Sequence, residues 1–356
     1  SRLASLRLSD SRRVLTGIAS ALRGQKEKGS MAPWWQDAYN WLLRQENGQE
    51  RRKLAISGLF ARAPEGSLPE ELALRLFTKG GRLRGSVTRF ERFKSCPFQH
   101  FAQYGLKLKE RQEYRFQALD LGNLLHSTLR EFGELLKADG RRWSEVGEVE
   151  WKAMVQEILA RLAPRLQNEI LLSTAQYRHQ LERIRILAER SIRRLIAFDA
   201  ASRFHPQVFE RSFGRGVGAM PPLSYELGKA RLEIVGQIDR MDFDEDGKYF
   251  LIIDYKTGQA YINLVEVYYG LKMQLLTYLL VARNLLSGTG AGEVLPAGML
   301  YCFLRYPTYR AEQRISPEEA RKKIESGLKM PGWVLADPEV IEAIDSKQQF
   351  IKVKLN

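Results

Sequence analysis

Apolar residues recur at helical spacing through much of the first two hundred positions. Residues 117–138 are predicted to form one helix and residues 147–200 two more, because apolar side chains return at steps of three and four. The positions that define these helices are Leu125, Leu129, Phe132, Leu136, Leu181, Ile184, Ala188, Ile192 and Leu195. Residues 1–80 show shorter helical stretches with polar connections, in which no chemistry can be recognised.

The pattern then changes to one that is typical of strands. Four strands and one helix are predicted: 206–213, 231–243, 249–257 and 297–305 as strands, and 265–286 as a helix. The apolar run 250–253 predicts a strand buried on both faces, and the turn-like residues 244–247 predict that the second and third strands form a hairpin. This order indicates an α/β fold, a mixed sheet flanked by helices, with an additional helical segment at the N-terminus.

The charge composition indicates what kind of molecule the protein binds. The 356 residues include 56 Lys and Arg against 42 Asp and Glu, which gives a net charge of +14 and a pI near 9.7. Such an excess favours a polyanion, and nucleic acid first of all, although solvated surface charge explains it equally well.

The two cysteines, Cys96 and Cys302, exclude a disulfide scaffold and a complete four-cysteine metal site within this chain. No apolar run is long enough to span a membrane and no signal-peptide core is present, so we expect no membrane partner and a cytoplasmic location. The first residue is not Met, which indicates a piece of a longer polypeptide.

Residues 81–116 mix cationic and aromatic side chains. Nine Lys or Arg lie between Arg82 and Arg115, interleaved with Phe90, Phe93, Phe98, Phe101 and Tyr104. Such a mixture can contact phosphates and stack on bases. The alternative is an amphipathic helix pair with the aromatic residues in a core, and for the aromatic residues alone this alternative is favoured.

The strongest chemical signal lies on the predicted hairpin. Asp254 and Lys256 are two residues apart, so they leave the same face of a strand, and the hairpin can bring Asp239 beside Asp254. Two carboxylates and an ammonium group fit a Mg²⁺ site for phosphodiester hydrolysis, with the carbonyl of Tyr255 as a further ligand. The alternative is a solvated ion-pair cluster at the strand ends.

Two helical segments add candidates. Glu266, Gly270, Gln274 and Tyr278 step by four and are predicted to share one helix face. His126 follows Gly122 by one helical turn, so that the glycine leaves room beside the imidazole. Taken alone, Gln274 and Tyr278 fit an ordinary polar flank, and His126 fits a histidine at the edge of the core.

Five elements in order resemble the RecB-type nucleases of the PD-(D/E)xK superfamily. They are G-x-x-x-H at 122–126, Glu210, G-x-x-D-R-x-D at 236–242, D-Y-K at 254–256 and Q-x-x-x-Y at 274–278. The resemblance implies a restriction-endonuclease-like fold, metal binding by Asp239, Asp254 and His126, and a catalytic Lys256. The resemblance also implies that Glu210, Gln274 and Tyr278 line the site and that Gln274 and Tyr278 are catalytic. Gly236, Arg240 and Asp242 are implied to support the site.

The flanking segments 86–111, 162–173 and 264–279 resemble the AddB family of bacterial helicase–nuclease subunits. This implies an Mg²⁺-dependent exonuclease that trims an unwound single strand of DNA, the 5′-ended one, in double-strand break repair, in a heterodimer with an AddA-like subunit. Residues 1–80 would end a helicase-like region, 81–116 would form a connector, and 117–356 the nuclease domain. The alternatives are a catalytically silent DNA-binding scaffold and a stand-alone nuclease.

The resemblance also implies a 4Fe–4S cluster, for which four cysteine ligands are usual. Cys96 matches the first ligand position, and the other ligands are absent from this chain. We therefore expect no cluster in these 356 residues, and a core position for Cys302 on its predicted strand.

Overall fold

A computed structural model describes most of the chain, in these segments: 11–44, 49–50, 52–53, 56–57, 66–109, 117–165, 171, 174–287, 294–305 and 314–354. Chain packing divides it into two compact units, Ser1–Pro69 and Glu70–Asn356. In the first unit, α2 (Ser11–Lys28) and α3 (Pro33–Leu43) pack through a small apolar core, which agrees with the predicted short helices. None of the helices in the described segments is both long and apolar enough to cross a membrane.

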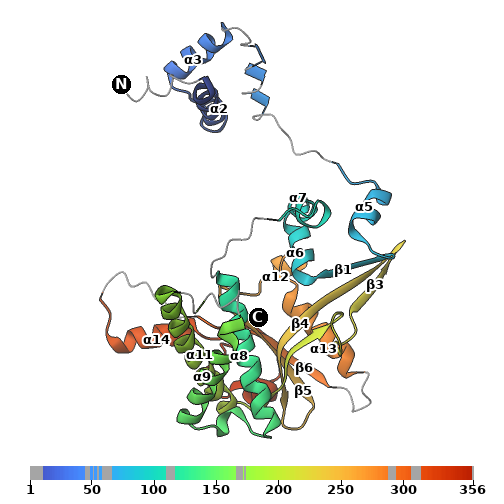
Figure 1. Cartoon of the computed structure of the whole chain (residues 1–356), viewed down its shortest axis with the longest axis vertical. Helices are drawn as coiled ribbons and strands as arrows, with labels where there is room; N and C mark the ends of the chain where they lie inside the picture. The colour runs from blue at the N-terminus through green and yellow to red at the C-terminus, as the bar shows by residue number, and fades with distance from the viewer. Residues whose placement is uncertain are drawn as a thin grey trace. The chain divides into compact units, whose positions relative to one another are not determined.

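The second unit is built on a sheet of seven strands (Figure 1). Its strands are β1 (Arg82–Ser86), β2 (Phe204–Phe213), β3 (Leu223–Leu227), β4 (Ala230–Asp244), β5 (Tyr249–Lys256), β6 (Leu295–Phe303) and β7 (Gly332–Val334). Strand β4 is the longest and organises the others. Its first half lies between parallel β1 and antiparallel β3, and its second half lies between antiparallel β2 and β5. Strand β6 runs parallel to β5, so the sheet is mixed, as predicted.

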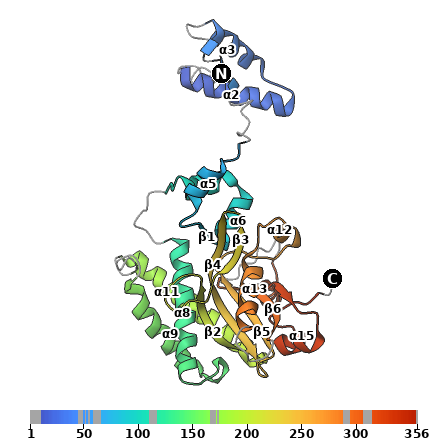
Figure 2. The same ribbon diagram turned by 90° about the vertical axis from the view of Figure 1, so that its right-hand side faces the viewer.

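Helices cover both faces of this sheet (Figure 2). The helix α5 (Glu70–Phe77) precedes β1, and between β1 and β2 come α6 (Val87–Ser95), α7 (Pro97–His100), α8 (Ala118–Ala138), α9 (Glu148–Leu162) and α11 (Ala175–Ala201). After β5 come α12 (Leu264–Tyr268), α13 (Gln274–Leu286), α14 (Pro317–Gly327) and α15 (Pro338–Asp345). The hairpin, the sheet and the helix positions confirm the predicted fold class.

Strand β5 separates two apolar cores. Leu251, Ile253 and Tyr255 face the core formed with α8, α9 and α11, and Phe250 and Ile252 face the core under α13. All four residues of the run 250–253 are fully buried, which confirms the prediction of a strand covered on both sides. The alternation places Asp254 and Lys256 on the α13 face and the Tyr255 ring on the other.

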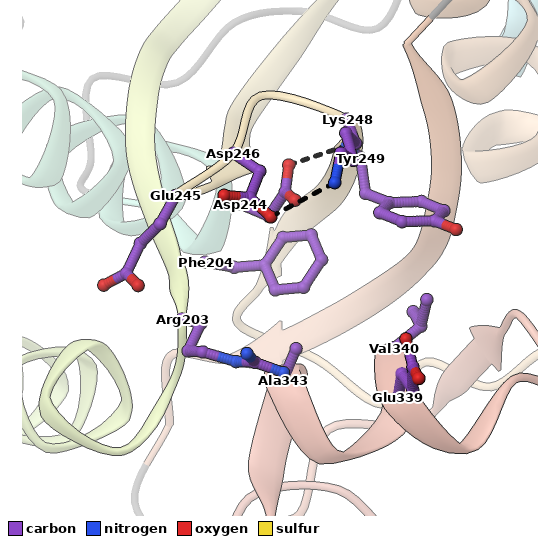
Figure 3. Close-up of a pocket in the computed structure, with 10 residues that line it drawn as sticks. All are labelled: Arg203, Phe204, Asp244, Glu245, Asp246, Lys248, Tyr249, Glu339, Val340 and Ala343. Atoms are coloured by element: carbon purple, nitrogen blue, oxygen red, sulfur yellow. Dashed lines mark hydrogen bonds and ion pairs between the residues drawn. The ribbon is translucent and has the colours of Figure 1, made fainter.

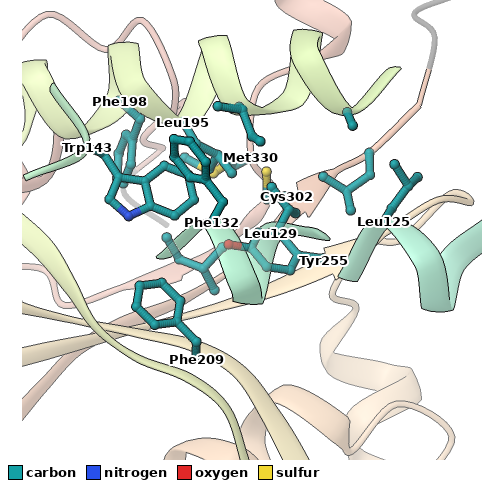
Figure 4. Packing of buried hydrophobic residues seen from close by; sticks show 14 of the residues in the cluster. Leu125, Leu129, Phe132, Trp143, Leu195, Phe198, Phe209, Tyr255, Cys302 and Met330 are labelled. Atoms are coloured by element: carbon teal, nitrogen blue, oxygen red, sulfur yellow. The ribbon is translucent and has the colours of Figure 1, made fainter. Parts of the chain in front are cut away.

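The core on the α8 side contains a group of aromatic rings among aliphatic side chains (Figure 4). Trp143 packs edge-on against Phe132 with ring centroids 4.9 Å apart and lies nearly parallel to Phe209. Cys302 is buried in the same core on β6, as predicted. This packing fixes the position of α8 on the sheet, and α8 carries His126.

The region 81–116 forms several short elements. After β1 and α6 come α7 and a π-helical turn, Phe101–Gly105, while residues 110–116 fall outside the described segments. Phe93 and Phe98 are 48% and 73% exposed, so the favoured placement of the aromatic residues in a core is wrong for these two. The ring of Tyr104 instead packs near the buried His100, with centroids 4.9 Å apart.

The predicted continuous helix at 265–286 is also wrong. Gly270 has a φ of +74°, which interrupts the helix between α12 and α13. Glycine adopts this left-handed conformation without the steric cost that a side chain brings. Glu266 and Gly270 therefore do not share a helix face with Gln274 and Tyr278, which stand together on α13.

A buried ion pair lies inside the α8-side core. Arg240 Nε and Nη2 donate to the two carboxylate oxygens of Asp242 at 2.6 and 2.7 Å, and both side chains are fully buried. The guanidinium carbon lies 5.0 Å from the centroid of Trp143. Desolvation opposes the charges on both groups, so each is kept ionised by the other.

Asp242→Asn should lower the free energy of unfolding by about 3–5 kcal/mol, because it leaves the buried Arg240 charge without its counter-charge. Asp246→Asn is the matched control, since the Asp246 side chain is 72% exposed in the β4–β5 turn. Urea unfolding checks both variants. Equal stabilities for the two would contradict a structural role for the ion pair.

Candidate active site

Three acidic residues, Glu210, Asp239 and Asp254, lie side by side on neighbouring strands at the point where β4 and β5 separate. The β4–β5 ladder ends at the pair Arg240 and Ile253, so the next pair in register would be Asp239 and Asp254. On the other side of β4, Phe209 pairs with Arg240 and Arg211 with Ile238, which places Glu210 opposite Asp239. The predicted approach of Asp239 to Asp254 is thus explained by the hairpin register.

The carboxylate of Asp239 occupies the gap between the separating strands. Its Oδ2 accepts a hydrogen bond from the backbone N–H of Tyr255 at 2.8 Å, in place of a β4 carbonyl. Its Oδ1 lies 3.4 Å from Nδ1 of His126, which reaches down from α8. The imidazole also packs edge-on against the ring of Tyr255, 5.6 Å between centroids.

Asp254 is the most deeply buried acid of the group, with 1% of its surface exposed. Burial, together with the charge of Asp239, raises its pKa to about 7, and Lys256 opposes the shift. Its Oδ2 lies 2.6 Å from Lys256 Nζ but makes no hydrogen bond of acceptable geometry, so this oxygen keeps lone pairs for another ligand.

Gln274 connects the two functional groups. Its Oε1 accepts a hydrogen bond from Lys256 Nζ at 2.9 Å, and its Nε2 donates to Asp254 Oδ1 at 3.1 Å and to the Tyr278 hydroxyl at 2.9 Å. This assignment of the amide oxygen and nitrogen satisfies all three contacts. The structure therefore brings Gln274 and Tyr278 together with Asp254 and Lys256, and their catalytic role stays a prediction.

Glu210 has an unusual backbone and several partners. Its φ is +43°, a conformation that non-glycine residues rarely adopt and that is concentrated at functional sites. Arg130 Nη1 donates to its carboxylate at 2.9 Å and Gln237 Nε2 at 3.2 Å. Burial raises the pKa of Glu210, and the charges of Arg130 and His126 oppose that rise.

His126 lies between the acids. Burial alone would lower its pKa, but the hydrogen bond and charge of Asp239, with the charges of Asp254 and Glu210, outweigh burial and raise it. Gly122, one turn earlier on α8, has space beside it, because an added Cβ would meet only Thr257 Oγ1, at 3.9 Å. The predicted room next to His126 is present.

The remaining predicted residues have structural roles elsewhere. Gly236 is required by packing, because a Cβ there would come within 2.7 Å of the Phe213 ring. Arg240 and Asp242 belong to the core and stabilise β4 without lining the site. Cys96 caps α7, with Sγ accepting from the N–H of Gln99 at 3.4 Å. Its role as a cluster ligand and that of the Tyr255 carbonyl as a metal ligand stay predictions.

Sequence reasoning missed two residues that contact the site. Arg130 follows His126 by one helical turn, so helical spacing was a signal that could have found it. Glu91 contacts the start of α13 from α6, 182 residues away along the chain, and no sequence pattern pointed to it.

The donor set fits a hard divalent cation. Within the described segments there is no cluster of three or more His, Cys, Asp or Glu arranged to hold a metal by themselves. Magnesium, however, is commonly held by one or two carboxylates, with waters and substrate phosphates as the other ligands. Asp239 and the buried Asp254 are the two carboxylates that would hold such an ion.

An acidic pocket of about 240 Å³ lies elsewhere, at the turn end of the hairpin (Figure 3). Two of its acids have partners within the turn: Asp244 Oδ1 accepts from the Tyr249 N–H at 2.7 Å, and Asp246 lies 3.4 Å from Lys248 Nζ. Closure of the turn therefore accounts for Asp244 and Asp246, and the pocket is separate from the Asp239–Asp254 group.

Comparisons with known proteins agree with this geometry. Residues 84–350 match the model of the PD-(D/E)XK nuclease superfamily, and residues 7–58 match that of the ATP-dependent helicase/deoxyribonuclease AddB fifth domain. The chain is 39% identical to the B-type subunit of an ATP-dependent helicase/deoxyribonuclease from Desulforamulus reducens over 94% of its own length, and 35% identical to that of Bacillus subtilis over 93%.

The chain spans only 29% and 28% of the lengths of these two relatives. The superfamily match, in contrast, covers most of the chain and includes every residue of the Asp239–Asp254 group. The chain therefore belongs to the PD-(D/E)XK nuclease superfamily and resembles, over nearly its whole length, part of the AddB helicase/deoxyribonuclease subunits.

Proposed function

We propose that this chain is an Mg²⁺-dependent deoxyribonuclease that hydrolyses phosphodiester bonds of single-stranded DNA. The observation that carries the proposal is the contact of buried Asp254 with both Lys256 and Gln274, beside Asp239. A solvated ion pair does not need a carboxylate that is 1% exposed or a glutamine that bonds both charged groups. A catalytic site, in contrast, requires such perturbed and oriented groups.

A bound divalent cation supplies positive charge at the phosphoryl oxygens and lowers the pKa of a bound water. Asp239 and Asp254 would hold it, with His126 beside them. Lys256 is 28% exposed on its side chain, so its ammonium reaches both Asp254 and the solvent side of the site. Having three N–H groups, it can bond Gln274 and still hold a water or a phosphate oxygen.

The similarity to AddB-type subunits supports a wider proposal. We propose that the chain is the nuclease part of a larger helicase–nuclease subunit in the cytoplasm, acting beside an AddA-like partner. Its substrate would be a single strand released at a double-strand break, the 5′-ended one. The net charge of +14 supports binding to a polyanion.

The segment between Lys256 and Gln274 carries exposed aromatic residues that suit single-stranded DNA. Tyr268 and Tyr269 are 84% and 61% exposed on and just after α12, and Tyr261 is 52% exposed with Lys272 Nζ 5.8 Å from its ring. Aromatic side chains stack on bases of any sequence, and nearby cations contact the phosphates. This segment would guide a strand to Lys256.

Asp254→Asn should abolish cleavage and leave binding of single-stranded DNA unchanged, because it removes a metal ligand and no basic surface. Its stability should be equal or higher, since a buried acid with a raised pKa is replaced by a neutral amide. End-labelled oligonucleotide assays with Mg²⁺ or EDTA, together with thermal melts, check this.

Asp246→Asn again serves as the control and should cut at the parent rate. A folded Asp254→Asn variant that also cuts at the parent rate would contradict the active-site assignment. A parent chain that binds DNA and never cuts it in Mg²⁺ would favour the silent scaffold instead.

Tyr268→Ala should weaken binding of single-stranded DNA by about 1–3 kcal/mol, the range for loss of one base–aromatic stack. Tyr225→Ala is the control, because Tyr225 is 46% exposed on β3, outside the segment between the catalytic residues. Fluorescence anisotropy with a labelled oligonucleotide measures both. Equal affinities of the two variants would show that the α12 segment does not bind the strand.

A further inference from the structure

We infer that Glu91 of α6 is a positioning residue for the active site, because its carboxylate caps the helix that carries Gln274. Glu91 Oε1 accepts hydrogen bonds from the backbone N–H groups of Met273 and Gln274 at 2.6 and 3.1 Å. Met273 is the N-cap residue of α13 and offers no side-chain cap, and the first turn of α13 contains no acid. The acceptor that α13 lacks locally is supplied by α6.

Such a cap has a clear physical basis. The first N–H groups of a helix have no intrahelical partner, and an anion at this end also interacts favourably with the helix dipole. Here both effects come from one carboxylate located 182 residues earlier in the chain. The start of α13 therefore depends on tertiary packing against α6.

The break before α13 increases this dependence. Gly270 interrupts the helix, so α12 does not extend into α13 and cannot fix its first residue. The side chain of Lys94, also on α6, covers this break: a Cβ on Gly270 would lie 3.1 Å from Lys94 Cγ and Cε. Two residues of α6 thus hold the linker and the first turn of α13.

Gln274 links the start of α13 to the candidate active site. Its backbone N–H is bound by Glu91, while its side chain bonds Lys256 and Asp254. Loss of the cap would let the first turn of α13 unwind, and Gln274 would then no longer hold Lys256 toward Asp254. The position of α6 therefore determines the position of Gln274, and cleavage activity depends on it.

The effect on cleavage rests on the proposed nuclease function, and the experiment separates the two. In the full chain, Glu91→Ala should lower kcat on single-stranded DNA tenfold or more with KM changed less than twofold, since Glu91 contacts protein N–H groups. Glu91→Gln should stay within threefold of the parent, because its amide oxygen can accept both hydrogen bonds. Glu134→Ala, which removes an exposed acid on α8, should match the parent.

Hydrogen exchange gives a readout that does not need activity. Amides of residues 271–277 should exchange faster in Glu91→Ala and at the parent rate in Glu91→Gln. Unchanged exchange in Glu91→Ala, or equal loss of kcat in both Glu91 variants, would overturn the capping role. A parent chain without nuclease activity would contradict the proposed function, and the exchange result would still decide whether Glu91 caps α13.

Discussion

The hydrogen bond from the Tyr255 N–H to the Asp239 carboxylate is the contact on which the site depends. Where β4 and β5 separate, their backbone groups lose their ladder partners, and a buried N–H without a partner is costly. Asp239 provides a side-chain acceptor at that point. One interaction therefore satisfies the N–H left by the separating strands and also fixes the Asp239 carboxylate at the opening.

The rest of the site surrounds this opening. Strand β2 contributes Glu210, strand β5 contributes Asp254 and Lys256, and α8 and α13 contribute His126 and Gln274. Three acids repel each other in one small region, and the charge of Asp239 adds to burial in raising the pKa of Asp254. Lys256, His126 and Arg130 offset part of this repulsion. What makes the site suitable for a cation is therefore its carboxylate oxygens, which are the ligands that Mg²⁺ prefers.

Much of this could be predicted from sequence because the relevant signals are local. The alternation in β5 and the short turn before it set the register of the hairpin, and the register places Asp239 opposite Asp254. Helical spacing identified the inward face of α8 and the pair Gln274 and Tyr278. The order of the motifs then identified the superfamily.

The break at Gly270 and the omission of Glu91 have a common physical cause, which is tertiary contact. The break at Gly270 depends on a positive φ and on the packing of Lys94 against it. Neither feature alters the helical spacing of apolar residues in the sequence 265–286, so the break could not be seen there. The contact of Glu91 with α13 joins residues 182 positions apart. Exposure of Phe93 and Phe98 likewise could not be derived from a pattern that fits an amphipathic helix pair equally well.

The most direct measurement is the Mg²⁺ dependence of single-turnover cleavage for the parent chain and for Asp239→Asn. The asparagine oxygen can still accept the Tyr255 N–H, so the fold and the melting temperature should be retained, while a charged metal ligand is lost. The account predicts saturable Mg²⁺ dependence in the parent and cleavage at least a hundredfold slower in the variant. The same Mg²⁺ dependence and rate in both proteins would contradict the account.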